Sequence, residues 1–289
     1  MIPIHVMPDT PTQAFLTALQ QQGFAGEIDT SAAQRAVYAT DNSIYERPPQ
    51  AIVCPQYVAD LQVLTRLLAE ERFRGVVVTA RGGGTGTNGQ SLTEGIVVDV
   101  SRHMNHILSI DVAKRQVRVQ AGVVKDQLNR ALKPHGLFFA PELSTSNRAT
   151  IGGMVNTDAS GQGSCTYGKT RDHVLALKTV LWGGEVLQSQ ALSEHTWRDD
   201  ITSLSASMQQ RFYALHELVS EHQDAIQAAF PNLNRCLTGY DLPHVLEQGR
   251  FNLNSVLCGA EGSLGLVAEA TLNVLPIPTE RVLVNISYA

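Results

Sequence analysis

Hydrophobic residues in the first third of the chain form three short apolar runs and two amphipathic segments. The runs are AIVCP from residue 51, GVVVTA from residue 75 and GIVVDVS from residue 95, each typical of a buried strand. Between the first two runs, the segment 58–73 places its apolar residues on one helical face: Val58, Leu61, Leu64, Leu67 and Leu68. Nearer the N-terminus, AFLTALQQQGF predicts a short helix. The pattern therefore predicts strands and helices in mixed order.

The rest of the chain is predicted to contain two strand pairs and two helices. HILSIDVAKRQVRVQAG predicts strands on either side of a turn at residues 112–115, and VLALKTVLWGGEVLQSQ predicts a hairpin turning at Gly183 and Gly184. VVKDQLNRALKPHG predicts a helix ended by Pro134 and Gly136, and residues 205–230 predict another. The last residues, TERVLVNISYA, resemble an unfinished strand, which predicts a truncated piece of a longer protein.

Composition narrows the function classes. The chain has 289 residues, of which 43% are hydrophobic and 17% charged, as in one large or two medium globular domains. Its net charge is −5 and it has no run of Lys or Arg, which argues against nucleic acid and anionic membranes as the main partners. We find no signal peptide and no apolar stretch of about 18 residues, so we expect a cytoplasmic protein without a membrane-spanning segment.

The cysteines and histidines do not form a recognisable metal motif. The four cysteines are far apart in the sequence and form no C-x-x-C pair: Cys54, Cys165, Cys236 and Cys258. We therefore expect reduced thiols and no metal site in this chain. The nine histidines are scattered, and we interpret His173 as structural rather than catalytic.

Residues 81–89, RGGGTGTNG, contain the pattern G-x-G-x-x-G directly after an apolar run. In a nicotinamide-binding Rossmann unit this pattern ends a strand and begins a helix whose N-terminus faces the pyrophosphate. Here only QSLTE separates Gly89 from the next strand, roughly half of the about 10–12 residues that a helical crossover needs, and Asp99 comes too early to bind the ribose. We interpret the loop instead as a nest of backbone N–H groups for a phosphate or pyrophosphate, with Arg81 adding positive charge.

Two later segments repeat this composition. FFAPELSTSNRATIGGMVNTDASGQGSCTYG, residues 138–168, is dense in Gly and short polar residues, and a loop of this length is usually functional. Its apolar residues Ile151, Met154 and Val155 argue against disorder. The third segment is CGAEGSLGLV, residues 258–267. Three such loops predict one elongated ligand that is contacted from several sides.

Taken in this order and spacing, the three loops resemble the FAD-binding domain of the vanillyl-alcohol oxidase/PCMH flavoprotein superfamily. One group within this superfamily is more similar to the chain than the others, the large bacterial D-2-hydroxyglutarate/D-lactate-type dehydrogenases. The similarity lies in the segments TDNSIYERPPQAIVCP and LTGYDLPHVL and in the sequence of the second loop. In that group an FAD-linked oxidase half is fused to an iron–sulfur half. The resemblance covers residues 35–289.

The resemblance implies an α+β fold of two α/β subdomains with FAD in the cleft between them. The implied divisions are an N-terminal helical extension at 1–34, subdomains at 35–108 and 109–278, a helical insertion at about 195–250, and the start of a truncated substrate-capping domain at 279–289. The residues implied to bind FAD are Arg81, Gly82, Gly83, Gly84, Thr85, Gly86, Asn88, Gly89, Pro141, Ser144, Thr145, Ser146, Asn147, Thr150, Gly152, Gly153, Asn156, Thr157, Asp158, Ala159, Ser160, Gly161, Tyr167, Glu261, Gly262, Ser263, Leu264, Gly265, Leu266 and Val267.

The resemblance also implies the chemistry. A D-2-hydroxyacid would be oxidised to the 2-oxoacid by hydride transfer to flavin N5, and an electron acceptor would then reoxidise the flavin. Relatives that attach FAD covalently carry a histidine where this chain has Thr85, so we expect non-covalent FAD. The catalytic base, the cap and any iron–sulfur cluster are expected downstream of this chain. We therefore expect the chain alone to turn over substrate poorly.

Other functions remain compatible with the sequence. Another FAD enzyme of the same fold, of the reductase or ether-lipid synthase type, would differ in the missing cap. A module that binds FAD or another nucleotide without chemistry is a second alternative. A nicotinamide dehydrogenase is the least favoured, because the crossover helix is missing.

Overall fold

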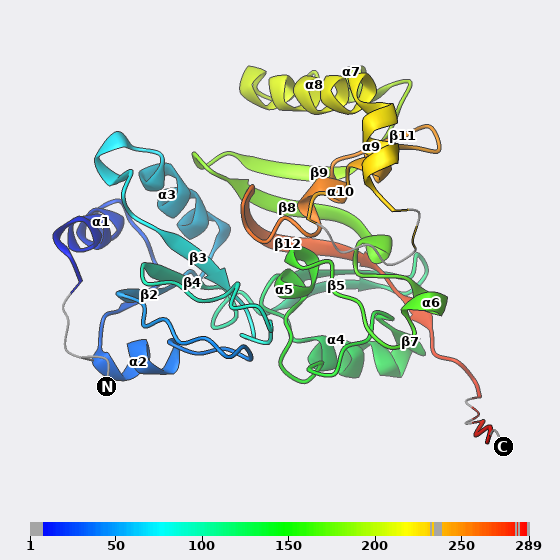
Figure 1. The fold of residues 1–289 in the computed structure, drawn as a ribbon, viewed down its shortest axis with the longest axis horizontal. Coiled ribbons are helices and arrows are strands. Elements are labelled where there is room, and N and C mark those ends of the chain that lie inside the picture. The colour runs from blue at the N-terminus through cyan, green and yellow to red at the C-terminus, as the bar shows by residue number, and fades with distance from the viewer. Residues whose placement is uncertain (1–7, 232, 234–238, 281, 283, 288–289) are drawn as a thin grey trace.

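The computed structural model describes residues 8–231, 233, 239–280, 282 and 284–287. Two main β-sheets lie side by side in this part of the chain, and helices cover their outer faces (Figure 1). The N-terminal residues build the smaller sheet, and the rest of the chain builds the larger one.

The smaller sheet has the strand order β1-β2-β4-β3. Its strands are β1 (Glu27–Asp29), β2 (Ala51–Cys54), β3 (Val78–Arg81) and β4 (Ile96–Asp99), and its helices are α1 (Thr10–Gln21), α2 (Ala32–Val37), α3 (Val58–Leu68) and the short η1 (Glu71–Phe73). Strands β2, β4 and β3 are parallel, while β1 is antiparallel to β2. Apolar residues of α1 and α3 are fully buried against this sheet, including Phe15, Leu19, Leu61 and Leu64. The segment 1–34, expected as an extension, therefore contributes helix α1 to this core.

The larger sheet is antiparallel, in the order β10-β11-β9-β8-β12-β6-β5. Its strands are β5 (Ile107–Asp111), β6 (Gln116–Gln120), β8 (Val174–Leu181), β9 (Val186–Ser193), β10 (Leu246–Glu247), β11 (Arg250–Asn252) and β12 (Gly265–Asn273). The central strand β12 pairs with both β6 and β8. Residues Val180, Leu266 and Ala268 of these strands also join the core of the smaller sheet, so the two sheets share buried contacts.

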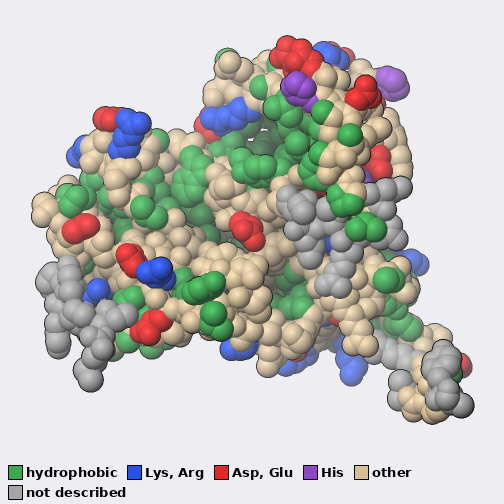
Figure 2. Space-filling view, viewed as in Figure 1, with side chains coloured by type: hydrophobic (Ala, Val, Ile, Leu, Met, Phe, Trp, Pro, Cys, Tyr) green, Lys and Arg blue, Asp and Glu red, His purple; other side chains and the backbone are tan. Residues whose placement is uncertain are grey.

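Helices and short segments surround the larger sheet. They are α4 (Lys125–Leu132), η2 (Lys133–His135), α5 (Ile151–Asn156), α6 (Ser164–Tyr167), η3 (Arg171–His173), α7 (Trp197–Asp200), α8 (Ala206–Glu221), α9 (Gln223–Ala229), η4 (Leu242–His244), α10 (Asn254–Leu257), and the pair β7 (Leu137–Phe138) and β13 (Leu275–Pro276). Trp197 is fully buried and its ring lies 4.9 Å from that of Phe251 on β11. Figure 2 shows hydrophobic side chains on the inner side of the α8–α9 layer and charged ones on its outer edge.

Most predicted strands and helices are confirmed. The turns at residues 112–115 and at Gly183 and Gly184 join antiparallel pairs β5–β6 and β8–β9. The helix at 123–136 is α4 followed by η2, and Gly136 takes a left-handed conformation. The strand expected at the C-terminus is absent from Val282 and residues 284–287, and the other residues beyond 280 lie outside the described part. The expected subdomain boundary at 108 falls inside β5, which belongs to the larger sheet.

Candidate functional site

The three glycine-rich loops meet in one cavity of about 330 Å³ between the two sheets. The first loop follows β3, the second contains α5, and the third precedes β12. In Figure 1 the end of β3 faces α5 across the middle of the molecule. Segments separated by about 180 residues of chain, from Arg81 to Glu261, therefore line the same space.

Backbone N–H groups of the first loop are available to a ligand. Within the described part of the chain, none of the backbone N–H groups of residues 82–87 donates a hydrogen bond to the protein. Buried or half-buried N–H groups normally have partners, so a row of free donors favours an anion at this position. No helix connects β3 to β4 in this described segment, as expected from the short connection. The loop thus has the donors of a phosphate site without a Rossmann helix.

Glycines of the first loop also let it pack against the second. A Cβ on Gly82 would lie 2.1 Å from Thr150 Oγ1, and one on Gly83 would lie 2.1 Å from the carbonyl oxygen of Arg148. Real Cβ contacts are never this short. The glycine run is therefore needed for contact between two loops, a role that the sequence motif did not reveal.

Arg81 supports the first loop from the side of α2. Its guanidinium donates to the carbonyls of Tyr38 at 3.3 Å and Thr40 at 2.7 Å, and it lies 5.1 Å from the Tyr38 ring. The Tyr38 hydroxyl donates to Asp99, which also accepts from the Ser101 hydroxyl. Burial lowers the pKa of Arg81, while the charges of Asp41 and Asp99 oppose that shift. Arg81 lines the cavity, but two of its donors hold the loop in place.

The middle of the second loop is helical, contrary to the expectation of one continuous polar loop over 138–168. Thr150 caps α5 by accepting the Gly153 N–H at 3.3 Å. Ile151, Met154 and Val155 are buried against the larger sheet, and this packing outweighs the low helix propensity of Gly152 and Gly153.

Asn156 ties the third loop to α5. Its backbone carbonyl accepts the Glu261 N–H at 2.9 Å, and its side-chain oxygen accepts the Gly262 N–H at 3.1 Å. The same amide donates to the carbonyl of Gly152 at 2.8 Å. Because the side chain is engaged on both sides, Asn156 positions the third loop rather than offering free groups to a ligand.

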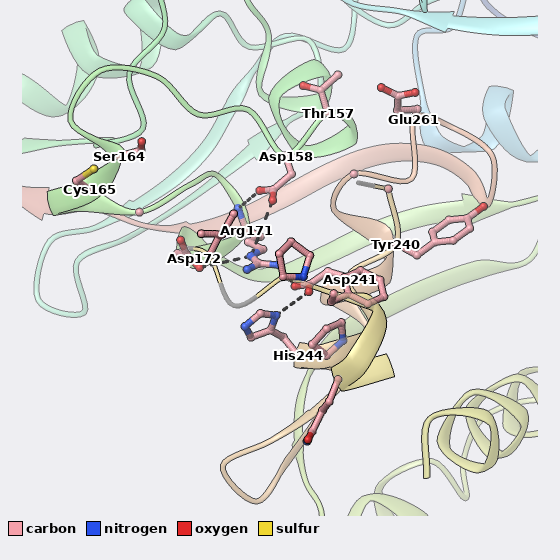
Figure 3. Close-up of a pocket in the computed structure, with 18 residues that line it drawn as sticks. Thr157, Asp158, Ser164, Cys165, Arg171, Asp172, Tyr240, Asp241, His244 and Glu261 are labelled. Atoms are coloured by element: carbon pink, nitrogen blue, oxygen red, sulfur yellow. Dashed lines mark hydrogen bonds and ion pairs between the residues drawn. The ribbon is translucent and has the colours of Figure 1, made fainter. Parts of the chain in front are cut away.

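Asp158 lies in a second, polar cavity of about 810 Å³ (Figure 3). Its buried carboxylate accepts from Lys169 Nζ at 2.7 Å and from the backbone N–H of Arg171 at 3.0 Å. Arg171 also pairs with Asp241, which accepts from His244 Nδ1 at 2.6 Å. Burial and the charge of Arg171 lower the pKa of His244. The GYDLPH segment is thereby joined to the second loop through paired charges.

The first cavity collects many of the implied FAD residues. Those that line it are Arg81, Gly82, Gly83, Gly84, Thr85, Gly86, Thr145, Thr150, Gly152, Gly153, Asn156, Thr157, Ala159, Ser160, Glu261, Gly262, Leu266 and Val267. Lining residues that were not among those implied to bind FAD are Ala80, Thr87, Gln90, Ser91, Val100, Ala121, Leu143, Ala149 and Met154. Several of these are apolar and carry no chemical signature.

The remaining implied residues lie outside this cavity. They are Asn88, Gly89, Pro141, Ser144, Ser146, Asn147, Asp158, Gly161, Tyr167, Ser263, Leu264 and Gly265. Ser144, Ser146 and Gly161 line a third cavity of about 770 Å³, which shares Leu143 and Ser160 with the first. The polar cavity shares Thr157 and Glu261 with the first. The first cavity and the polar cavity together give room for an elongated ligand.

The other candidate residues have structural surroundings. His173 is buried, and its Nε2 lies 2.7 Å from the carbonyl oxygen of Tyr167. Cys54 and Cys258 are buried free thiols, Cys165 is exposed, and Cys236 lies outside the described residues. In the described part of the chain, no cluster of three His, Cys, Asp or Glu side chains is arranged for a metal ion. The helices described there are too short or too polar to cross a bilayer.

Comparison with known proteins defines the class of this site. The family described as "FAD binding domain" matches residues 49–190, which contain the first two loops, so this part of the chain belongs to that family of FAD-binding domains. Over 98% of its length the chain is 61% identical to D-2-hydroxyglutarate dehydrogenase of Pseudomonas putida, and over 95% it is 50% identical to that of Escherichia coli K12. The chain spans only 28% and 27% of those relatives.

Solved structures show the same fold. Alkyldihydroxyacetonephosphate synthase matches 96% of the chain with a TM-score of 0.65 at 20% identity, and the chain covers 46% of it. The BBE-like 1 protein of Physcomitrella patens matches 90% with a TM-score of 0.60 at 19% identity, and the chain covers 44% of it. These likenesses confirm the expected α+β fold of the FAD-binding flavoproteins.

The residues of the cavity fit FAD. The free N–H groups of residues 82–87 can bind a pyrophosphate, and the adjoining polar cavity gives room for a further part of the molecule. Thr85 lines the cavity and has no nucleophilic nitrogen for a covalent flavin bond.

Proposed function

We propose that this chain is the FAD-binding part of a dehydrogenase that oxidises a D-2-hydroxyacid of the D-2-hydroxyglutarate or D-lactate class. The main support for this assignment of the reaction is the 61% identity to a D-2-hydroxyglutarate dehydrogenase over nearly the whole chain. When bound, FAD would supply the hydride acceptor for C2 of the substrate.

The chain's own residues would bind and orient the cofactor. We propose that the N–H groups of residues 82–87 hold the pyrophosphate, that the second loop lies along the flavin, and that residues 261–267 contact the adenosine end. Arg81 and Asn156 would position these loops through their hydrogen bonds. We further propose that the thirty implied residues act as one FAD site even though some lie outside the first cavity.

The finer assignments are proposals as well. We propose a division into two subdomains between β4 and β5, a cytoplasmic location, and an electron acceptor that receives electrons from the flavin. An iron–sulfur cluster, a substrate cap and the catalytic base are proposed for the part of the relatives that this chain does not span.

Two measurements test the proposal. The protein should take up FAD with the visible spectrum of a bound flavin, and acid precipitation should release that flavin into the supernatant because Thr85 cannot hold it covalently. Flavin that stays in the precipitate would show covalent attachment.

The second measurement addresses the reaction. In the full-length protein, D-2-hydroxyglutarate or D-lactate should bleach the flavin under anaerobic conditions, while L-2-hydroxyglutarate serves as the stereochemical control. A bound flavin that no 2-hydroxyacid bleaches would favour a non-catalytic module or another FAD enzyme of this fold. This 289-residue chain alone should bleach slowly.

A further inference from the structure

The third cavity contains a buried lysine that the FAD site does not use. The cavity measures about 770 Å³ and lies between the start of α4 and the second loop. Lys125 lines it together with Glu142, Ser144, Ser146 and Ser160. It adjoins the FAD cavity through Leu143 and Ser160, which line both.

Lys125 is buried without a partner. The residue is 5% exposed, and in the described part of the chain its ammonium group has no hydrogen-bond or ion-pair partner. Burial lowers the pKa of Lys125, and the charges of Asp126 and Glu142 oppose that shift only in part. The ammonium is not among the fully enclosed groups that lack a partner, so it opens onto the cavity. A largely desolvated ammonium without a partner is costly, which favours an anionic ligand in that cavity.

Ser160 provides a second unpaired group. Its hydroxyl oxygen is buried and has no hydrogen-bond partner in the described part of the chain. Since Ser160 lines both cavities, a ligand in either one can reach it. An ammonium and a hydroxyl that both lack protein partners thus lie along the same cavity.

We propose that Lys125, together with Ser160 at the boundary with the FAD site, forms a subsite for a carboxylate of an organic acid at the edge of the FAD cleft. The inference rests on the proposed function, because it assigns one group of that reaction's substrate class to this cavity. A carboxylate fits better than a phosphate, since the lining contains Lys125 and Lys133 against Asp126 and Glu142. One unpaired ammonium balances a single negative charge in such surroundings, but not two.

The test uses glutarate, a dicarboxylate that the flavin cannot oxidise at C2, and the FAD-loaded protein. Binding is followed by calorimetry and by the change in flavin absorption. Lys125→Gln should weaken glutarate binding about tenfold or more, because a charge-assisted hydrogen bond is lost. Lys125→Arg should keep it within about threefold, and Ser160→Ala should weaken it less than Lys125→Gln does.

Matched controls keep the result specific. Lys133→Gln removes the same charge from an exposed residue of the same cavity and should leave glutarate affinity within about twofold. Neutral glutaramide should bind all variants equally weakly. If Lys125→Gln binds glutarate as the wild type does, the subsite is refuted.

A loss of FAD affinity in Lys125→Gln would also refute the proposal, because Lys125 would then belong to the cofactor site. A wild-type protein that binds no FAD would instead refute the proposed function, and the flavin spectrum separates the two cases. If Lys125→Gln fails to fold, Lys125→Arg and Ser160→Ala still compare the two partner groups in folded protein.

Discussion

The glycines of the first loop have separate physical roles at the scale of single residues. Gly82 and Gly83 give space to the second loop, whereas the N–H groups of residues 82–87 have no protein acceptor and can donate to a ligand. The sequence motif predicted an anion-binding loop and explained all three glycines in the same way, as space for backbone N–H groups to approach a phosphate. Contacts with Thr150 and Arg148 depend on residues far along the chain, so no local pattern could reveal them.

We predict that Gly83→Ala separates the first two loops. Its Cβ would lie 2.1 Å from the Arg148 carbonyl oxygen and 2.8 Å from the carbon, and backbone atoms cannot rotate away. Overpacking of this kind costs about 1–3 kcal/mol, and FAD affinity should fall about tenfold or more. Fluorescence titration with FAD measures the dissociation constant. Gly75→Ala, where a Cβ meets nothing within 4 Å, is the control and should bind FAD normally.

We predict a pH-dependent penalty from Lys125 in the protein without ligand. Because the pKa of Lys125 is lowered on folding, the unfolded chain holds more protons between the folded pKa and 10.5. The wild-type free energy of unfolding should therefore rise with pH across that range. Lys125→Met should be more stable by about 1 kcal/mol at neutral pH, and this advantage should shrink toward pH 10. Urea unfolding of both proteins at several pH values gives the difference; a constant difference would contradict it.

At the scale of elements, the local sequence pattern predicted those helices and hairpins whose stability depends on contacts within one segment. The two hairpins, the amphipathic α3 and the helix α4 follow from spacing and turn residues within each segment. Helix α5 was not predicted, because its glycines disfavour a helix and its stability comes from burying Ile151, Met154 and Val155. Likewise Tyr38 and Thr40, which hold Arg81, have no motif of their own.

We predict that Asn156 determines how the third loop meets α5. Asn156→Ala removes the acceptor for the Gly262 N–H and the donor to Gly152, so FAD affinity should fall about tenfold. Asn156→Asp keeps the acceptor alone and should lose less. Asn105→Ala, an exposed asparagine bonded to the carbonyls of Ser101 and Arg102, is the control. Equal FAD dissociation constants for Asn156→Ala and wild type would show that the loop needs no such link.

At the scale of the whole molecule, the site exists only because two sheets meet. The first loop belongs to the smaller sheet, while α5 and the third loop belong to the larger one. A cofactor in the cleft should therefore connect both sheets and stabilise them together. The resemblance of three motifs predicted this arrangement, but the supporting contacts between the loops could be obtained only from the folded chain.

We predict that FAD stabilises the protein more than FMN does. A ligand that binds only the folded state at a hundredfold excess over its dissociation constant adds about 2.7 kcal/mol to the free energy of unfolding. FMN has the flavin but lacks the adenosine half, so it cannot use the N–H groups of residues 82–87 for a pyrophosphate or contact residues 261–267. At equal concentration, FMN should thus raise the urea midpoint less than FAD. Equal shifts would mean that the first and third loops contribute nothing to binding, and the cleft between the sheets would then not be the FAD site.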